Sequence, residues 1–186
     1  MGGITTHPIL RDRVTMLGAT GPIAAERELL RGTTFELFRH RTEPGLVALY
    51  AVRVTPAGPE LADAAEQRLL AALRPTDIVA RLDDIDLAVL AGGLLNAPAV
   101  FALNDRLLSS LRQPTMCHDG TMAHPMVSIG LALTGNPLRT ADDLLRAARR
   151  SVTIAERRGG NCVELADPEF TGLLDLTGVG RADPPV

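Results

Sequence analysis

The sequence has no lysine and no tryptophan, and it contains few aromatic residues of any kind. All 19 basic residues are arginine, and Phe, Trp and Tyr together make up 3% of the 186 residues. A folded core must therefore be aliphatic, and an apolar fraction of 46% is ordinary for one globular domain. The net charge is −3 and no basic tract occurs, which argues against a nucleic-acid partner.

Cysteine pairs and long uninterrupted hydrophobic runs are also missing. Cys117 and Cys162 are the two cysteines, and no CxxC motif is present, which is typical of a reduced, cytoplasmic chain. The most apolar region, residues 87–103, is interrupted by Gly92-Gly93 and by Pro98, so we do not expect it to span a bilayer. No signal peptide is recognisable, and we predict a cytoplasmic location without membrane association.

Hydrophobic periodicity and turn residues divide the chain into strands and helices. Proline at a first helical position and glycine after the last predict the first helix, and a capping box at Thr140 and Asp143 begins the last one. Asp-Asp at 83–84 and Asp-Gly at 119–120 predict two hairpins. The predicted elements are helix 22–31, strand 46–54, helix 59–73, strands 78–82 and 85–90, a loop at 92–98, helix 99–111, strands 115–118 and 122–133, a helix from 140 to about 158, and strand 163–165.

This order of elements predicts an α+β fold, in which helices pack on a central, mostly antiparallel sheet. We divide the chain into an N-terminal lead and helix at residues 1–45, a domain at 46–165 and a C-terminal tail at 166–186.

Two stretches resemble the diguanylate cyclase (GGDEF) family. That family has an Arg-x-x-Asp motif before a strand of the form Val-Ala-Arg-Leu, and here Arg74 and Asp77 precede Val-Ala-Arg-Leu at 79–82. Val-Ser-Ile-Gly-Leu-Ala at 127–132 is similar to a second family strand. The resemblance covers about residues 46–165 and implies the nucleotidyl-cyclase-like sheet of that family.

The signature that gives the family its activity is altered in this chain. Residues 83–87 read Asp-Asp-Ile-Asp-Leu in place of Gly-Gly-Asp/Glu-Glu-Phe, so the glycines that let phosphates approach the backbone are absent. The resemblance implies a metal-binding Asp within 52–54, which read Val-Arg-Val, and a phosphate-binding Lys where Glu156 stands. The family's guanine-reading segment is missing after Val54. We therefore predict a degenerate domain that is not an enzyme, with no catalytic residues, no metal and no cofactor.

The Arg-x-x-Asp motif, in contrast, keeps its spacing to the signature turn. In the family this motif binds cyclic di-GMP at an inhibitory site with a second arginine from the following helix, for which Arg106 is the candidate. A carboxylate can accept from a guanine edge, and a guanidinium can donate two bonds to a phosphate. The resemblance thus implies a ligand site at Arg74, Asp77 and Arg106. A local role for Arg74 and Asp77, ending a helix and capping a strand, is the alternative.

Two classes of function remain open. The first is a regulatory module that binds cyclic di-GMP, and the second is a protein-interaction or homodimerisation scaffold that needs no nucleotide. GTP binding without turnover is a weaker third reading, because the guanine-reading segment is missing. A metal cluster of Cys117, His118, Asp119 and His124 is disfavoured, since neighbours along a strand point to opposite faces.

Overall fold

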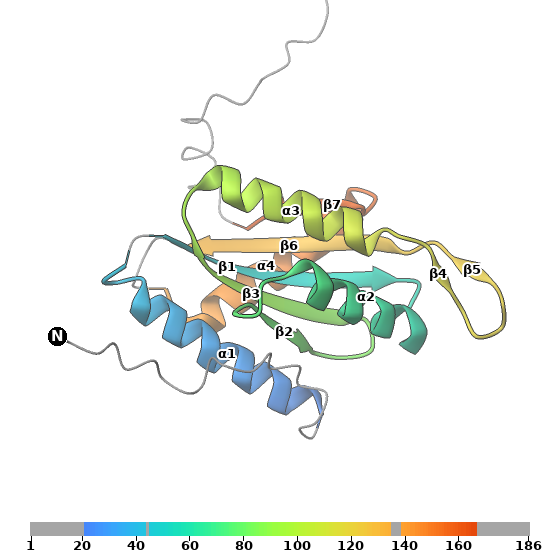
Figure 1. Cartoon of the computed structure of the whole chain (residues 1–186), viewed down its shortest axis with the longest axis horizontal. Coiled ribbons are helices and arrows are strands. Elements are labelled where there is room, and N and C mark those ends of the chain that lie inside the picture. Colours follow the sequence, from blue (N-terminus) through green and yellow to red (C-terminus); the bar gives the residue numbers. More distant parts are fainter. Residues whose placement is uncertain (1–20, 44, 135–138, 167–186) are drawn as a thin grey trace, which may run out of the picture.

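The computed structural model describes residues 21–43, 45–134 and 139–166, which fold into a five-stranded central sheet with helices on both faces and a separate two-stranded hairpin (Figure 1). Residues 1–20 and 44 of the predicted lead, and residues 167–186 of the predicted tail, lie outside the described residues. The elements are α1 (Pro22–Arg39), β1 (Leu46–Thr55), α2 (Pro59–Ala72), β2 (Ile78–Arg81), β3 (Asp86–Leu94), α3 (Ala97–Leu111), β4 (Thr115–Met116), β5 (Met122–Ala123), β6 (Met126–Thr134), α4 (Ala141–Arg157) and β7 (Cys162–Leu165).

The central sheet has the strand order β2-β3-β1-β6-β7. Its neighbours pair antiparallel except β6 and β7, which are parallel. Helices α2 and α3 cover one face of the sheet, and α1 and α4 cover the other (Figure 1). The prediction of an α+β fold with a mostly antiparallel sheet is therefore confirmed.

Strand β1 lies at the centre of the sheet and is buried on both faces, so its side chains alternate between the two hydrophobic cores. Tyr50 and Val52 pack with α2 and α3, whereas Leu49 and Ala51 pack with α1 and α4. Successive side chains of a strand point to opposite faces. Arg53 therefore emerges on the side of α4, although it is the one charged residue in an otherwise uncharged strand.

Side-chain caps set the starts of the last two helices. Thr140 accepts a hydrogen bond from the Asp143 N–H (3.1 Å) and donates its hydroxyl to Asp143 Oδ2 (2.7 Å), so the predicted capping box is confirmed. Asn96 accepts from the Ala99 N–H (3.1 Å), and α3 begins at Ala97, two residues before the predicted start. A proline is compatible with this first turn because its missing N–H would have no helical partner there.

Helix α1 corrects the first predicted boundary, because it continues to Arg39 instead of ending at residue 31. A Cβ added at Gly32 would collide with the side chain of Ile78 and come within 3.3 Å of Leu90. The glycine therefore lets α1 pass close to β2 and β3, where the pattern alone suggested a helix end. The buried residues Thr33 and Leu37 continue the same apolar face beyond it.

The predicted loop at 92–98 is also wrong at its start, because β3 continues through Gly92 and Gly93 to Leu94. A Cβ at Gly92 would overlap the side chain of Glu36 on α1, so this glycine provides space for a neighbouring element. Within the part of the chain that is described, no helix combines the length and apolar character needed to cross a bilayer.

The second predicted hairpin is divided in two. Strands β4 and β5 form a small sheet of their own, and β6 leaves them to pair with β1 in the central sheet. His124 and Pro125 separate β5 from β6. Proline has no N–H to donate to a ladder, which explains why one continuous strand over 122–133 does not form.

Candidate ligand pocket and altered signature edge

Arg74 and Asp77 lie in the turn that joins α2 to β2. The Arg74 N–H donates to Asp77 Oδ2 (2.9 Å), and the Asp77 N–H donates to the Arg74 carbonyl (3.0 Å). The local capping role is therefore present in the structure. It occupies one carboxylate oxygen of Asp77 and leaves the Arg74 guanidinium outside the turn.

The structure also brings the three predicted ligand residues together. Arg74, Asp77 and Arg106 line one pocket of about 140 Å³ between the turn and α3, and its remaining lining consists of Leu94, Ala99, Ala102 and Leu103. Within the described residues, neither guanidinium donates a hydrogen bond. The pocket thus combines one carboxylate, two guanidinium groups that make no hydrogen bond to a described side chain or backbone group, and an apolar wall.

Burial is the main influence on the acid in this pocket. It raises the pKa of Asp77, while the Arg74 N–H and the charges of Arg74 and Arg106 partly oppose the rise. A partly buried carboxylate beside two cations is suited to accepting hydrogen bonds from a ligand, because burial limits the number of water molecules that can donate to it instead.

Two interacting residues near this pocket were not predicted from the sequence. The fully buried Tyr50 hydroxyl donates to Asn104 Oδ1 (3.0 Å), joining the centre of β1 to α3. Burial raises the pKa of Tyr50, and Asp77 raises it further. Tyr50 is the chain's single tyrosine and lies in a largely apolar strand, and this placement could have indicated a buried hydroxyl that needs a partner. Its partner, however, is 54 residues away.

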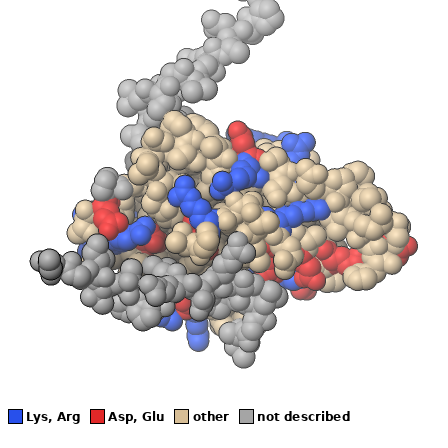
Figure 2. Space-filling view, in the orientation of Figure 1, with Lys and Arg blue, Asp and Glu red and all other residues tan. Residues whose placement is uncertain are grey.

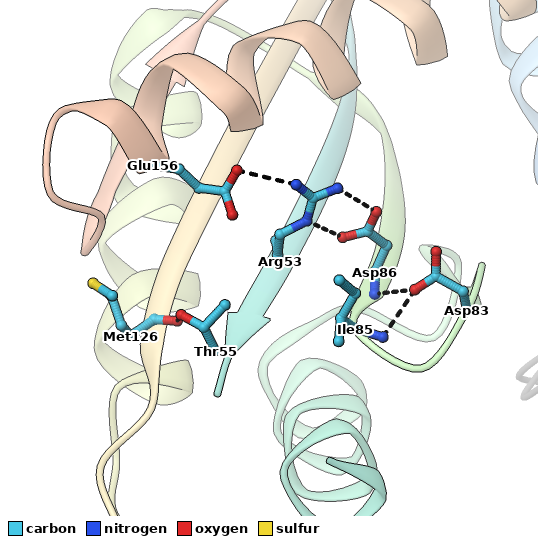
Figure 3. A network of polar contacts seen from close by, with 7 residues as sticks. All are labelled: Arg53, Thr55, Asp83, Ile85, Asp86, Met126 and Glu156. Atoms are coloured by element: carbon cyan, nitrogen blue, oxygen red, sulfur yellow. Dashed lines mark hydrogen bonds and ion pairs between the residues drawn. The ribbon is translucent and has the colours of Figure 1, made fainter. Parts of the chain in front are cut away.

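A second polar site lies at the edge of the sheet near the signature turn (Figure 3). Arg53 donates from Nε to Asp86 Oδ1 (2.6 Å) and from Nη2 to Asp86 Oδ2 (2.7 Å). Its Nη1 donates to Glu156 Oε2 on α4 (3.0 Å). The side chains of Arg53 and Asp86 are 28% and 17% exposed, so both are largely shielded from water. One guanidinium therefore occupies both oxygens of the carboxylate that remains in the signature.

The Asp83 carboxylate accepts hydrogen bonds from the backbone N–H groups of the signature turn. Its Oδ1 accepts from the Ile85 N–H (2.8 Å) and from the Asp86 N–H (2.7 Å), as Figure 3 shows. Backbone N–H groups clustered in a turn are a general anion site. Here an internal carboxylate already fills it, so an incoming phosphate would have to displace Asp83.

Comparison with known families now identifies the chain. The family model described as "Diguanylate cyclase, GGDEF domain" matches residues 56–162. The chain belongs to the GGDEF-domain family. Its sequence is 32% identical over 106 residues to the diguanylate cyclase TpbB of Pseudomonas aeruginosa. That match covers 55% of this chain and 24% of TpbB, so the chain corresponds to about a quarter of its curated relative.

Solved GGDEF structures share the fold. The isolated GGDEF domain of TpbB superimposes with a TM-score of 0.65 at 23% identity, covering 82% of this chain and 93% of that one. The GGDEF domain of DgcB from Caulobacter crescentus, solved in complex with c-di-GMP, gives 0.61 at 16% identity, covering 81% and 96%. The predicted family and its fold are thus confirmed, and the chain is a domain of a class related to cyclic di-GMP.

In this GGDEF domain the polar groups at the signature edge are paired with side chains of the domain itself. Arg53 stands in the stretch where the family resemblance implies a metal-binding aspartate, and Glu156 stands where it implies a lysine. Among the described residues, no group of three His, Cys, Asp or Glu side chains could hold a metal ion. Cys117, His118, Asp119 and His124 accordingly do not form a cluster.

The surface charge of the GGDEF domain is dispersed on the face that carries α2 and α3. Figure 2 shows arginine surface there as separate patches divided by neutral atoms, within the described part of the chain. The requirement for a nucleic-acid partner is a continuous basic stripe or patch. The face seen in Figure 2 does not present one.

Proposed function

We propose that this GGDEF domain is a non-catalytic regulatory module that binds cyclic di-GMP through Arg74, Asp77 and Arg106. The observation that supports it is the convergence of these three side chains on one pocket, where neither guanidinium donates a hydrogen bond to a described residue. Asp77 would accept from the Watson–Crick edge of a guanine. The two arginines would donate to a phosphate or to the guanine O6 and N7.

The absence of turnover is supported by the signature edge. A cyclase must hold divalent cations with carboxylates and a triphosphate against backbone N–H groups. Here the Arg53 guanidinium lies beside Asp86 where a metal ion would bind. The Asp83 carboxylate accepts hydrogen bonds from the backbone N–H groups of the turn that would bind a phosphate. Glu156 adds a further negative charge where a phosphate would need a cation.

We expect no cyclic di-GMP to form when the protein is incubated with GTP and Mg²⁺ or Mn²⁺. The reason is that the one retained signature carboxylate is bound at both oxygens by Arg53. Chromatography of the reaction mixture checks this, with an active diguanylate cyclase as positive control. Any product above the level of a no-protein blank would refute the non-catalytic part of the proposal.

Isothermal titration calorimetry tests the ligand site. We expect the wild-type protein to bind cyclic di-GMP and Arg74→Ala to weaken that binding by about 10- to 100-fold, the cost of one or two charged hydrogen bonds. Arg112→Ala is the matched control, because Arg112 follows the same helix as Arg106 but lies outside the pocket. No binding at high micromolar ligand, or equal losses in both variants, would remove the ligand site from the proposal.

Binding should also depend on pH through Asp77. Burial raises the pKa of this carboxyl, so it takes up a proton at a higher pH than an ordinary aspartate does. Only the ionised form accepts two bonds from a guanine edge, so the affinity should fall as the pH is lowered from neutral through the raised pKa. Calorimetry at several pH values checks this, and an Asp77→Asn variant should show a weaker but flat profile. A wild-type profile as flat as that of the variant would contradict the assigned role.

The alternative function is a nucleotide-independent interaction or homodimerisation scaffold. The observation that favours it is the exposed apolar surface of α1, where Ile23 is 71% and Phe38 67% exposed. A sedimentation experiment with and without cyclic di-GMP distinguishes the two functions. Self-association that is unaffected by the ligand supports the scaffold, and assembly that depends on the ligand supports the receptor.

A further inference from the structure

All the methionines of the described residues lie at one place, the hairpin of β4 and β5 and its exit. Met116, Met122 and Met126 are 62%, 49% and 45% exposed. His118 and His124 lie in the same short stretch. Methionine usually fills gaps in cores, so three exposed thioethers beside two imidazoles form an unusual surface. Thioether sulfur is a soft donor that favours Cu(I), and imidazole nitrogen also binds copper.

The register of the hairpin brings two of the thioethers together. Met116 pairs with Met122 across the two strands. The Cys117 N–H donates to the Thr121 carbonyl (2.9 Å), so Cys117 and Thr121 form the hydrogen-bonded pair and the methionines form the next, non-hydrogen-bonded pair. Side chains approach most closely in such pairs, with Cβ atoms about 4.5–5.5 Å apart.

His124 is the next donor along the chain, one residue beyond the end of β5 (Met122–Ala123). It follows Met122 by two residues, and it is exposed whereas Ala123 and Pro125 on either side of it are more buried. Alternate residues of an extended chain share a face. If the chain stays extended for one residue beyond β5, His124 is the diagonal neighbour of Met116, at about 7–8 Å, a span that the flexible methionine side chain can close around an ion.

We propose that Met116, Met122 and His124 form a binding site for Cu(I) on this hairpin. The three donors carry no charge, so a monovalent soft cation suits them better than Mg²⁺ or Zn²⁺, which prefer carboxylates or thiolates. The hairpin projects beyond the end of β6 and away from the sheet, which leaves the site open to solvent (Figure 1).

The neighbouring residues Cys117 and His118 interact with Glu60 on α2. His118 Nδ1 lies 2.5 Å from Glu60 Oε1 on α2, and the His118 N–H also donates to Glu60. The Cys117 side chain is half-buried and is hydrogen-bonded to the same Glu60. The side of the hairpin tip formed by Cys117 and His118 is therefore anchored to α2, and the methionine face is the part without such contacts.

Anaerobic titration with Cu(I) against a chromogenic chelator tests the site. The reference protein carries Cys117→Ser and Cys162→Ser, so that thiols do not contribute. We expect uptake of one equivalent of Cu(I), with NMR shifts of the Met116 and Met122 methyl groups and unchanged Met126. In this background Met116→Leu and Met122→Leu should each abolish uptake, and His124→Gln should weaken it at least tenfold. Leucine is close to methionine in volume, so folding should be retained.

Met126→Leu is the matched control, because Met126 is nearly as exposed as Met122 but lies over Gly160 rather than in the hairpin pair. It should bind Cu(I) like the reference protein. The proposal is overturned if the reference protein takes up no Cu(I), or if Met116→Leu and Met122→Leu bind as tightly as it does. An unchanged affinity in His124→Gln would overturn the assignment of the third ligand.

Discussion

Arg53→Ala should lower the free energy of unfolding by about 2–3 kcal/mol, because it leaves Asp86 and Glu156 close together without their shared cation. Arg53 donates three hydrogen bonds of 2.6–3.0 Å to these two carboxylates. They raise the pKa of Arg53, so its charge is held throughout any accessible pH. The value is set below that of a fully buried pair, because Glu156 keeps 32% of its side chain exposed.

Urea denaturation followed by circular dichroism measures this loss, which is appropriate for a chain without tryptophan. Arg81→Ala is the control: Arg81 pairs with Asp63, whose side chain is 67% exposed, so its removal should cost less than about 1 kcal/mol. Replacing both members of the buried pair, as Arg53→Met with Asp86→Leu, should recover much of the loss. Equal effects of Arg53→Ala and Arg81→Ala would show that the signature edge is not held by this network.

Gly130→Ala should have an effect of similar or larger size, about 3 kcal/mol, through steric overlap. A Cβ at Gly130 would overlap the Ala148 carbonyl and lie 2.6 Å from the Val152 backbone nitrogen. Both atoms belong to the backbone of α4, which cannot yield locally. Helix α4 would have to move away from β6, and Glu156 would move with it away from Arg53.

Gly32→Ala provides the contrast. Its new Cβ would meet the flexible end of the Ile78 side chain instead of backbone, and alanine favours a helix over glycine by about 1 kcal/mol. The two effects should nearly cancel. The urea midpoints of the two variants measure this difference, provided that the dependence of the unfolding free energy on urea concentration is the same in both. If Gly130→Ala is as mild as Gly32→Ala, the close approach of α4 to β6 is not a strict requirement of the fold.

The features that could be predicted from the sequence are those carried by local patterns. Periodicity and turn residues identify the order of the elements, and the capping box at Thr140 depends on atoms three residues apart. The Arg-x-x-Asp motif beside a recognisable strand indicates the family, which the family match confirms. The same spacing, with Arg106 one element later, identified three residues that the structure places around one pocket. The predicted domain boundaries and the lack of activity stay predictions.

Tertiary structure decided the features that depend on pairing between distant strands. Arg53 meets partners 33 and 103 residues away, so the sequence shows the altered charges at Arg53 and Glu156 but not that they pair with each other beside Asp86. Gly32 and Gly92 look like a helix end and a loop, yet they provide space for Ile78 and Glu36. The pairing of Met116 with Met122 likewise follows from the register of the hairpin. Local pattern is encoded in neighbouring residues, whereas register and close packing are settled only when the whole sheet assembles.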